Sequence, residues 1–204
     1  MIGPRPKGAE AMIEPSDSCA QGARPRSRTG REGPLFRFDI VEDDGDWSRL
    51  QPVARLAQRV ARTAADHVPG FPGPTMATLA LSSDAQVRAL NLKWRGKDGP
   101  TNVLSFRAAS LVRPPANDCG FLGDIVLASE TLFREAAQAD IEPPHHFQHL
   151  VVHGLLHLMG YDHESESEAD VMEGLEIRIL AALGLGSPYA DHSGPHQSRS
   201  IPTS

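Results

Sequence analysis

Three histidines near the carboxyl end of the chain have the spacing of a metal site. In the stretch HGLLHLMGYDH, His153 and His157 are four residues apart. On an α-helix this spacing places both imidazoles on one face, where they can bind the same ion. Gly160 can end such a helix in a left-handed conformation, and this turn would bring His163 to the same ion. Three imidazoles with one open coordination position are typical of catalytic zinc, so we predict one Zn²⁺ per chain.

Further histidines leave an alternative for the helical pair. Histidines recur at every fourth residue from position 145 to position 157, so His149 and His153 would have the same geometry. His157 is preferred because His163 follows just beyond the glycine that ends the helix. His145 and His149 are then expected to be partly exposed helix residues.

The same spacing resembles the metzincin protease pattern H-E-x-x-H-x-x-G-x-x-H, with one difference. Gly154 stands where those proteases have the glutamate that acts as general base. A protease would therefore need a displaced base, such as Glu164 or Glu166. These two acids also fit the first turn of a following helix, so peptide hydrolysis is an alternative and not the first interpretation.

Cationic side chains in the middle of the chain could bind phosphate. The stretch KWRGK holds Lys93, Arg95 and Lys97 around Trp94. A guanidinium can hold a phosphodiester through two parallel hydrogen bonds, and Trp94 could stack on a base or pack in the core. In the absence of a metal site, a solvated loop would be the simpler interpretation of this stretch.

Two aspartates are further candidates for the site. Asp162 lies in GYDH, directly before the third histidine, and Asp124 lies in GDI. Each either orients the metal ligands through hydrogen bonds or caps a turn.

Composition favours a soluble domain with unstructured ends. The 204 residues are 40% hydrophobic and 23% charged, with a net charge of -6, which argues weakly against a general nucleic-acid binder. There is no apolar run of the ~18 residues that a membrane span needs, and no segment resembles a signal peptide. Cys19 and Cys119 form no disulfide framework, so we expect a cytoplasmic protein. Residues 1–34 and 186–204 are predicted to be disordered, which leaves a domain of residues 35–185.

Hydrophobic periodicity between these ends predicts the elements that must position the candidate residues. Alternation in FRFDIV and ATLALS, and the short apolar runs NVLSF and DIVLAS, predict four strands. Ser165 and Glu168 predict a capping box at the start of the last helix. The other helices are predicted from Asp46 to His67, from Asp84 to Lys93, from Ser129 or Thr131 to Ala139, and from Pro143 to Met159.

Three of these stretches together resemble the YbeY family of bacterial metal-dependent endoribonucleases. HLVVHGLLHLMGYDHESESEADVMEGLEIRIL is similar to the family's signature, LNLKWRGKDGPTNVLSF (Leu90–Phe106) to its second motif, and LGDIVLA (Leu122–Ala128) to its third. Their order and spacing extend the resemblance over Phe36 to Leu185, without either tail. Asn102 and Arg107 depart from the family, which commonly has aspartate and proline at these positions.

The resemblance implies a single α+β domain, with a small sheet of about four strands flanked by helices and a metal site at a helix C-terminus. It implies cleavage of single-stranded RNA, maturation of the 16S ribosomal RNA 3′ end, and ribosome quality control, with the ribosome or its proteins as partners and no membrane. Arg95 corresponds to the family's functional arginine. A zinc metalloprotease with a displaced base, or a ribosome-associated binding protein with a structural metal, is the alternative. The metal ligands that the resemblance implies are His153, His157 and His163.

Overall fold

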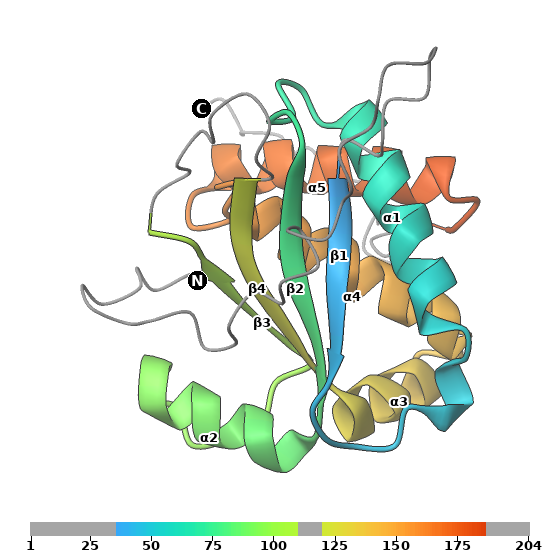
Figure 1. The fold of residues 1–204 in the computed structure, drawn as a ribbon, viewed down its shortest axis with the longest axis vertical. Helices are drawn as coiled ribbons and strands as arrows, with labels where there is room; N and C mark the ends of the chain where they lie inside the picture. The colour runs from blue at the N-terminus through green and yellow to red at the C-terminus, as the bar shows by residue number, and fades with distance from the viewer. Residues whose placement is uncertain (1–35, 110–119, 187–204) are drawn as a thin grey trace, which may run out of the picture.

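Four strands form a mixed sheet in the computed structural model, which describes residues 36–109 and 120–186 (Figure 1). Their order across the sheet is β1-β2-β4-β3. The pairs β1–β2 and β2–β4 are parallel, whereas β3 runs antiparallel to β4 at the edge. The predicted α+β class with four strands is therefore confirmed. The strands are β1 (Phe36–Glu42), β2 (Thr75–Ser82), β3 (Val103–Arg107) and β4 (Gly120–Ala128).

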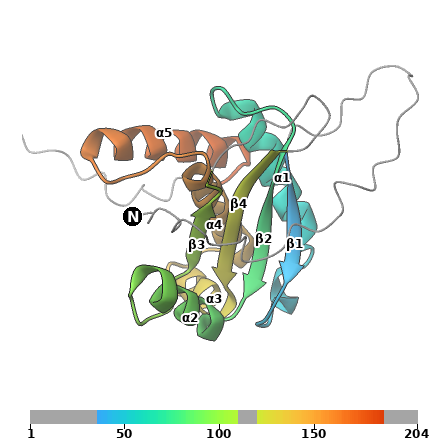
Figure 2. The ribbon, with the colours of Figure 1, turned by 60° about the vertical axis from the view of Figure 1, so that its left-hand side comes forward.

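Helices cover the two faces of this sheet unequally. Helices α1, α4 and α5 pack together on one face, and α3 contacts α4, whereas α2 contacts β4 and α3. Figure 1 shows the sheet in front of α4 and α5, and Figure 2 shows α2 away from that group. No described helix is both long enough and apolar enough to cross a membrane. The helices are α1 (Val53–His67), α2 (Asp84–Arg95), α3 (Ser129–Gln138), α4 (Pro143–Leu158) and α5 (Glu166–Ala182).

Alternation along the strands produces two cores. Leu79 of β2 and Ile125 of β4 belong to the large core that α1, α4 and α5 complete. Their neighbours Ala80 and Val126 face the other way and pack with Val87 of α2 in a small core. Helix α4 has buried residues almost all around it, which leaves few positions on it for polar side chains.

The predicted helix from Asp46 is wrong in its first seven residues, 46–52. A short 3-10 turn spans Ser48–Leu50, and α1 begins only at Val53. Pro52 has no backbone N–H and disfavours a helical conformation at the residue before it, so it separates the two. The carboxylate of Asp46 holds the preceding turn by accepting hydrogen bonds from the backbone N–H of Ser48 at 3.0 Å and from its hydroxyl at 2.6 Å.

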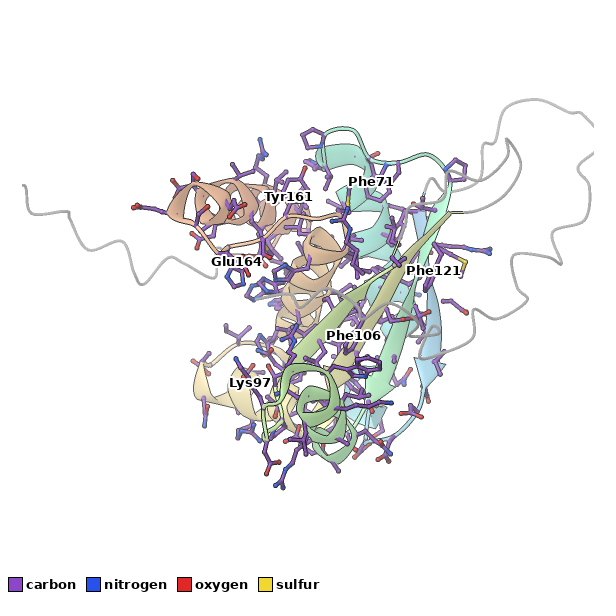
Figure 3. The ribbon with its side chains drawn as sticks, turned by 90° about the vertical axis from the view of Figure 1, so that its left-hand side faces the viewer. Phe71, Lys97, Phe106, Phe121, Tyr161 and Glu164 are labelled. Carbon is purple, nitrogen blue, oxygen red and sulfur yellow. The ribbon has the colours of Figure 1, made fainter. Side chains whose placement is uncertain are left out.

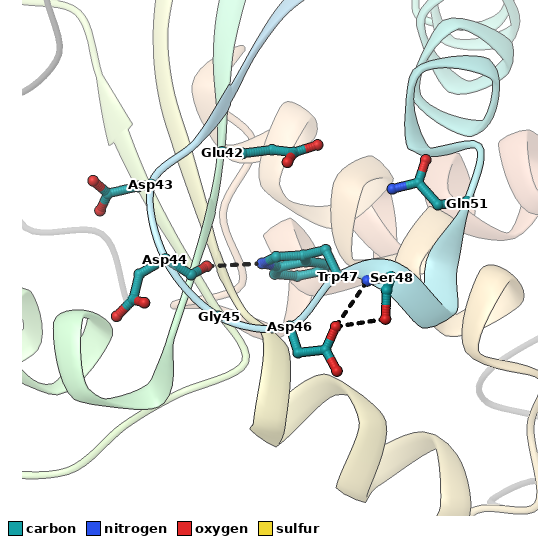
Figure 4. A pocket seen from close by; sticks show the side chains of 8 residues that line it. All are labelled: Glu42, Asp43, Asp44, Gly45, Asp46, Trp47, Ser48 and Gln51. Atoms are coloured by element: carbon teal, nitrogen blue, oxygen red, sulfur yellow. Dashed lines mark hydrogen bonds between the residues drawn. The ribbon is translucent and has the colours of Figure 1, made fainter.

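A pocket of about 420 Å³ lies beside this turn (Figure 4). Its floor is the indole of Trp47, which donates a hydrogen bond to the carbonyl of Asp44 at 3.1 Å. Four acidic side chains line it, so its charge repels anionic ligands such as RNA. They are Glu42, Asp43, Asp44 and Asp46.

The two ends of the chain lie outside the described residues. This holds for residues 1–34 and, apart from Gly186, for residues 186–204. Their disorder therefore stays a prediction.

Candidate metal centre

The three predicted histidines lie together near the carboxyl end of α4. His153 and His157 project from the helix, and His163 lies in the segment that follows it. Each offers one ring nitrogen, and the three nitrogens lie within 4.8 Å of one another. The ring centroid of His157 is 4.6 Å from that of His153 and 5.2 Å from that of His163. The cluster could hold one metal ion, as the spacing predicted.

A left-handed glycine turns the chain so that His163 meets the helical pair. Gly160 has a φ of +92°, which glycine adopts without the steric cost of a Cβ. The backbone N–H groups of residues 159–161 donate to carbonyl groups in the last turn of α4 and close the helix end. Helix α5 then begins with the predicted capping box of Ser165 and Glu168.

Hydrogen-bond acceptors orient both helical imidazoles. Nδ1 of His157 lies 3.0 Å from the carbonyl oxygen of Tyr161, and Nδ1 of His153 lies 3.4 Å from Oε1 of Glu176. A proton on each Nδ1 satisfies these acceptors and leaves the lone pair on Nε2, which is the tautomer that binds a metal. The two Nε2 atoms lie 3.0 Å apart inside the cluster. This donor set fits Zn²⁺.

The protonation of His157 also suits metal binding. Burial is the main cause that lowers its pKa to about 4, and the neighbouring His153 acts in the same direction. At neutral pH the imidazole is therefore uncharged. It can bind an ion without first losing a proton.

Glu176 of α5 was not among the predicted site residues. Its side chain is fully buried, and its Oε1 lies 3.1 Å from Nε2 of His149 and 3.4 Å from Nδ1 of His153. Burial raises the pKa of this carboxyl, but hydrogen bonding from the two histidines outweighs burial and lowers the pKa to about 2. A fixed negative charge beside Nδ1 of His153 holds the ring in place and makes its Nε2 a stronger donor.

The sequence does contain a signal for Glu176. It shares the inward face of α5 with Met172 and Ile179, at helical spacings of four and three. A carboxylate at a core position requires a partner. Glu176 has two, the partly exposed His149 and the cluster residue His153. His149 is thus a neighbour of the cluster and not a member of it.

Arg95 lies at the end of α2 and within electrostatic reach of the turn that carries His163. Its side chain is half-buried; burial lowers its pKa, and the charge of Asp162 opposes that effect. Oδ1 of Asp162 lies 4.0 Å from Nδ1 of His157 and accepts a hydrogen bond from the backbone N–H of His163 at 2.9 Å. The charge of Asp162 therefore acts on both Arg95 and His157.

The two lysines beside Arg95 are exposed. Nζ of Lys93 lies 4.9 Å from the centre of the Trp94 ring, and that ring packs edge-on against Phe106 of β3 at 6.4 Å. The second contact agrees with the packing interpretation of Trp94. Figure 3 shows Lys97 beside α2 and Glu164 beside α5 on the same side of the molecule.

Asp124 lies away from the histidines. It is fully buried in the middle of β4, opposite Phe106 of β3, so it caps no turn. Its neighbour Ile125 faces Gly154 of α4, and successive strand residues point to opposite faces. The structure therefore brings Asp162 to the cluster and leaves Asp124 on the α2 side of the sheet.

Gly154 lies where α4 packs tightly against the sheet. A Cβ atom there would lie 3.0 Å from Cγ2 of Ile125 and 3.1 Å from Oγ of Ser105. The Ser105 hydroxyl donates to the carbonyl of Gly154 at 3.3 Å. The position at which metzincins have their glutamate thus points into packed strands, with no room for a long side chain.

The two departures from the family pattern lie outside the set of metal ligands. Nδ2 of Asn102 donates to Oε2 of Glu135 at 2.9 Å, and the same oxygen lies 2.9 Å from Nε2 of His146. Arg107 ends β3 and places its guanidinium against Gly160.

The chain is similar to known proteins in structure and in sequence. A solution structure from Thermotoga maritima aligns with 80% of this chain and 100% of its own, at 22% sequence identity and a TM-score of 0.47. The sequence model of the family described as Endoribonuclease YbeY matches residues 42–184.

Three proteins named Endoribonuclease YbeY show high sequence identity to this chain. The protein from Azorhizobium caulinodans is 51% identical over 155 residues, 74% of this chain and 94% of its own. The one from Rhodospirillum rubrum is 50% identical over 173 residues, 80% and 86% of the two chains. The one from Rhizobium meliloti is 47% identical over 165 residues, 78% and 97%. The chain therefore belongs to the YbeY family.

Proposed function

We propose that this protein is a zinc-dependent endoribonuclease that cleaves single-stranded RNA. The observation that carries the proposal is the convergence of three imidazole nitrogens within 4.8 Å, beside a turn whose Asp162 acts electrostatically on Arg95. A metal site with a cation next to it suits a phosphodiester, because the reaction develops negative charge on phosphoryl oxygens. The names of the relatives support the same reaction class.

The finer assignments follow the family resemblance. We propose that the substrate is ribosomal RNA, that the protein matures the 3′ end of 16S ribosomal RNA, and that it serves ribosome quality control in the cytoplasm. The ribosome or its proteins would be its partners. Residues 35–185 would form the catalytic domain, with 1–34 and 186–204 as disordered extensions.

Each group at the site has a separate task in this proposal. His153, His157 and His163 would hold Zn²⁺, which when bound polarises a phosphoryl oxygen and offsets its charge. Arg95 binds two oxygens of the scissile phosphate through its planar fork of donors. Asp162 positions that guanidinium. Lys93 and Lys97, which are exposed beside Arg95, would contact flanking phosphates.

A peptidase is less well supported by the geometry. Gly154 faces the sheet and could not be replaced by a glutamate that reaches the histidines. Glu164 is exposed, and Glu166 begins α5 as a first-turn acid. Among the described residues, neither carboxylate forms a hydrogen bond or ion pair with a cluster histidine.

One experiment separates the three candidate functions. Metal-loaded protein is incubated with a labelled single-stranded RNA and, in parallel, with casein, and the bound metal is measured by elemental analysis. We expect about one zinc per chain and cleavage of the RNA only. Cleavage of casein would favour the peptidase. Metal and RNA binding without cleavage of either substrate would favour a binding protein with a structural metal.

A further inference from the structure

The side chain of Arg107 reaches from the end of β3 to the turn between the metal ligands. A Cβ atom at Gly160 would lie 2.6 Å from Nη1 of Arg107 and 3.0 Å from its Cζ. The guanidinium therefore packs against the bare Cα of Gly160, which lies midway in sequence between His157 and His163. Any larger residue at position 160 would displace it.

Arg107 forms no ion pair among the residues that the structure describes. Its side chain is exposed, like that of Arg88, which pairs with Asp98. The last carbonyls of α4 already accept backbone N–H groups from residues 159–161. The negative end of the α4 dipole still favours a cation there, and the guanidinium lies against Gly160 with no hydrogen-bond acceptor among the described side chains.

A second arginine approaches the same turn from another element. Arg95 on α2 acts on Asp162, while Arg107 on β3 contacts Gly160. The start of α5, which follows His163 in the chain, carries exposed acidic residues. A polyanion is attracted along the line between the two arginines and repelled from α5.

We propose that Arg107 binds a second phosphate of the RNA backbone, next to the phosphate held by the histidine cluster and Arg95. This inference rests on the proposed endoribonuclease function. Phosphate contacts fix the position of a strand without reading its bases. Two contacts from different elements, α2 and β3, fix the direction of the strand at the cluster, whereas a single contact does not.

A contact to a non-reacting phosphate has a distinct kinetic signature. It binds the substrate and the transition state equally, so its loss raises the half-saturating concentration and leaves the maximal rate nearly unchanged. For Arg107→Ala we expect the half-saturating concentration to increase about tenfold, which corresponds to the loss of one charge-assisted hydrogen bond. The slope of log affinity against log salt should fall by about 0.7, the value for one single-strand phosphate contact.

The test is single-turnover cleavage of a labelled single-stranded RNA by metal-loaded protein over a KCl series. Arg107→Ala is compared with Arg107→Lys, which keeps the charge and should keep the salt slope. Arg62→Ala is the matched control, because Arg62 is also exposed but lies on α1, across the molecule from α2 in Figure 1. Zinc content and melting temperature are measured for each variant.

Two outcomes would overturn the assignment. One is a half-saturating concentration and salt slope for Arg107→Ala equal to those of Arg62→Ala. The other is an unchanged slope together with lost zinc or a lower melting temperature, which would make Arg107 a structural support for the α4 end. If the unchanged protein cleaves no RNA, the proposed function fails. Anisotropy with a single-stranded 2′-deoxy oligomer of the same sequence still measures the slope and tests Arg107 separately.

Discussion

The histidine cluster has a buried side and an exposed side, and the two differ in what holds their charges. On the buried side, the carboxylate of Glu176 lies between His149 and His153, inside the contact of α4 with α5. On the exposed side, the half-buried Arg95 and the exposed Lys97 have no ion pair among the described residues. The buried charges are satisfied within the fold and serve the ion, whereas the exposed charges are available to a ligand from outside.

The largest effect is expected from the histidine that both sides share. His157→Ala removes one of three ligands, so we expect bound zinc to fall from about one per chain to nearly none, with cleavage falling to background. Elemental analysis and single-turnover cleavage measure both quantities. His145→Ala is the control, because His145 is exposed on the same helix and outside the cluster. Retention of zinc by His157→Ala would show that this histidine is not a required metal ligand, and the comparison of the two sides of a metal site would then not hold.

The exposed side predicts a loss of rate without a loss of metal. Arg95→Ala should keep its zinc and lower the cleavage rate by ~10²–10³, the usual effect of removing one preorganised charge stabiliser. Arg95→Lys should recover only part of this, because an ammonium lacks the two-donor fork. Arg88→Ala on the same helix removes an exposed arginine that pairs with Asp98, and it should cleave normally. Full cleavage by Arg95→Ala would contradict the phosphate role.

The buried side predicts the converse result. Glu176→Gln keeps the shape of the side chain but removes the charge beside His153, so we expect zinc affinity to weaken about 10–100-fold. Competition with a chelator measures the affinity. Glu173→Gln, a half-buried position on the same helix, is the matched control. Equal affinities for the two variants would show that Glu176 only fills the helix interface.

Much of this arrangement could be predicted from local sequence, because the signals are local. The histidines, Gly160 and the capping box lie within sixteen residues. Over this distance, helix geometry and one turn determine which side chains lie close together. Two strands followed from alternation and two from short apolar runs bounded by turn residues. The start of α1 was predicted too early, at Asp46, because helical spacing of apolar residues continues through 46–52 while Pro52 interrupts the backbone.

The rest depends on contacts between elements. Glu176 of α5 contacts His153 of α4, and the spacing of residues along the sequence does not show which helices pack against each other. Asp124 was assigned to the site from its motif, but its role depends on which face of β4 is covered by α4. The approach of Arg107 to Gly160 likewise joins a strand end to a helix end far away in sequence.

The smallest expected effect concerns the face of α4 that packs on the sheet at Gly154 and holds no proposed site residue. Gly154→Ala gains helix propensity, up to ~1 kcal/mol, but its methyl group must displace Ile125 and Ser105 from contacts of 3.0 and 3.1 Å. Overpacking of this kind costs about 1–3 kcal/mol, so we expect a net loss of unfolding free energy with unchanged zinc affinity.

Gly174 on α5 provides the control for that last change, because a Cβ atom there would meet nothing within 4 Å. Gly174→Ala should raise the unfolding free energy by about 0.5–1 kcal/mol. Denaturant unfolding of the zinc-loaded variants compares the two. If Gly154→Ala stabilised the protein as much as Gly174→Ala, then helix–sheet packing would not be what requires glycine beside His153. In the expected case, the glycine at the position of the protease glutamate is needed because α4 packs there directly against Ser105 of β3 and Ile125 of β4.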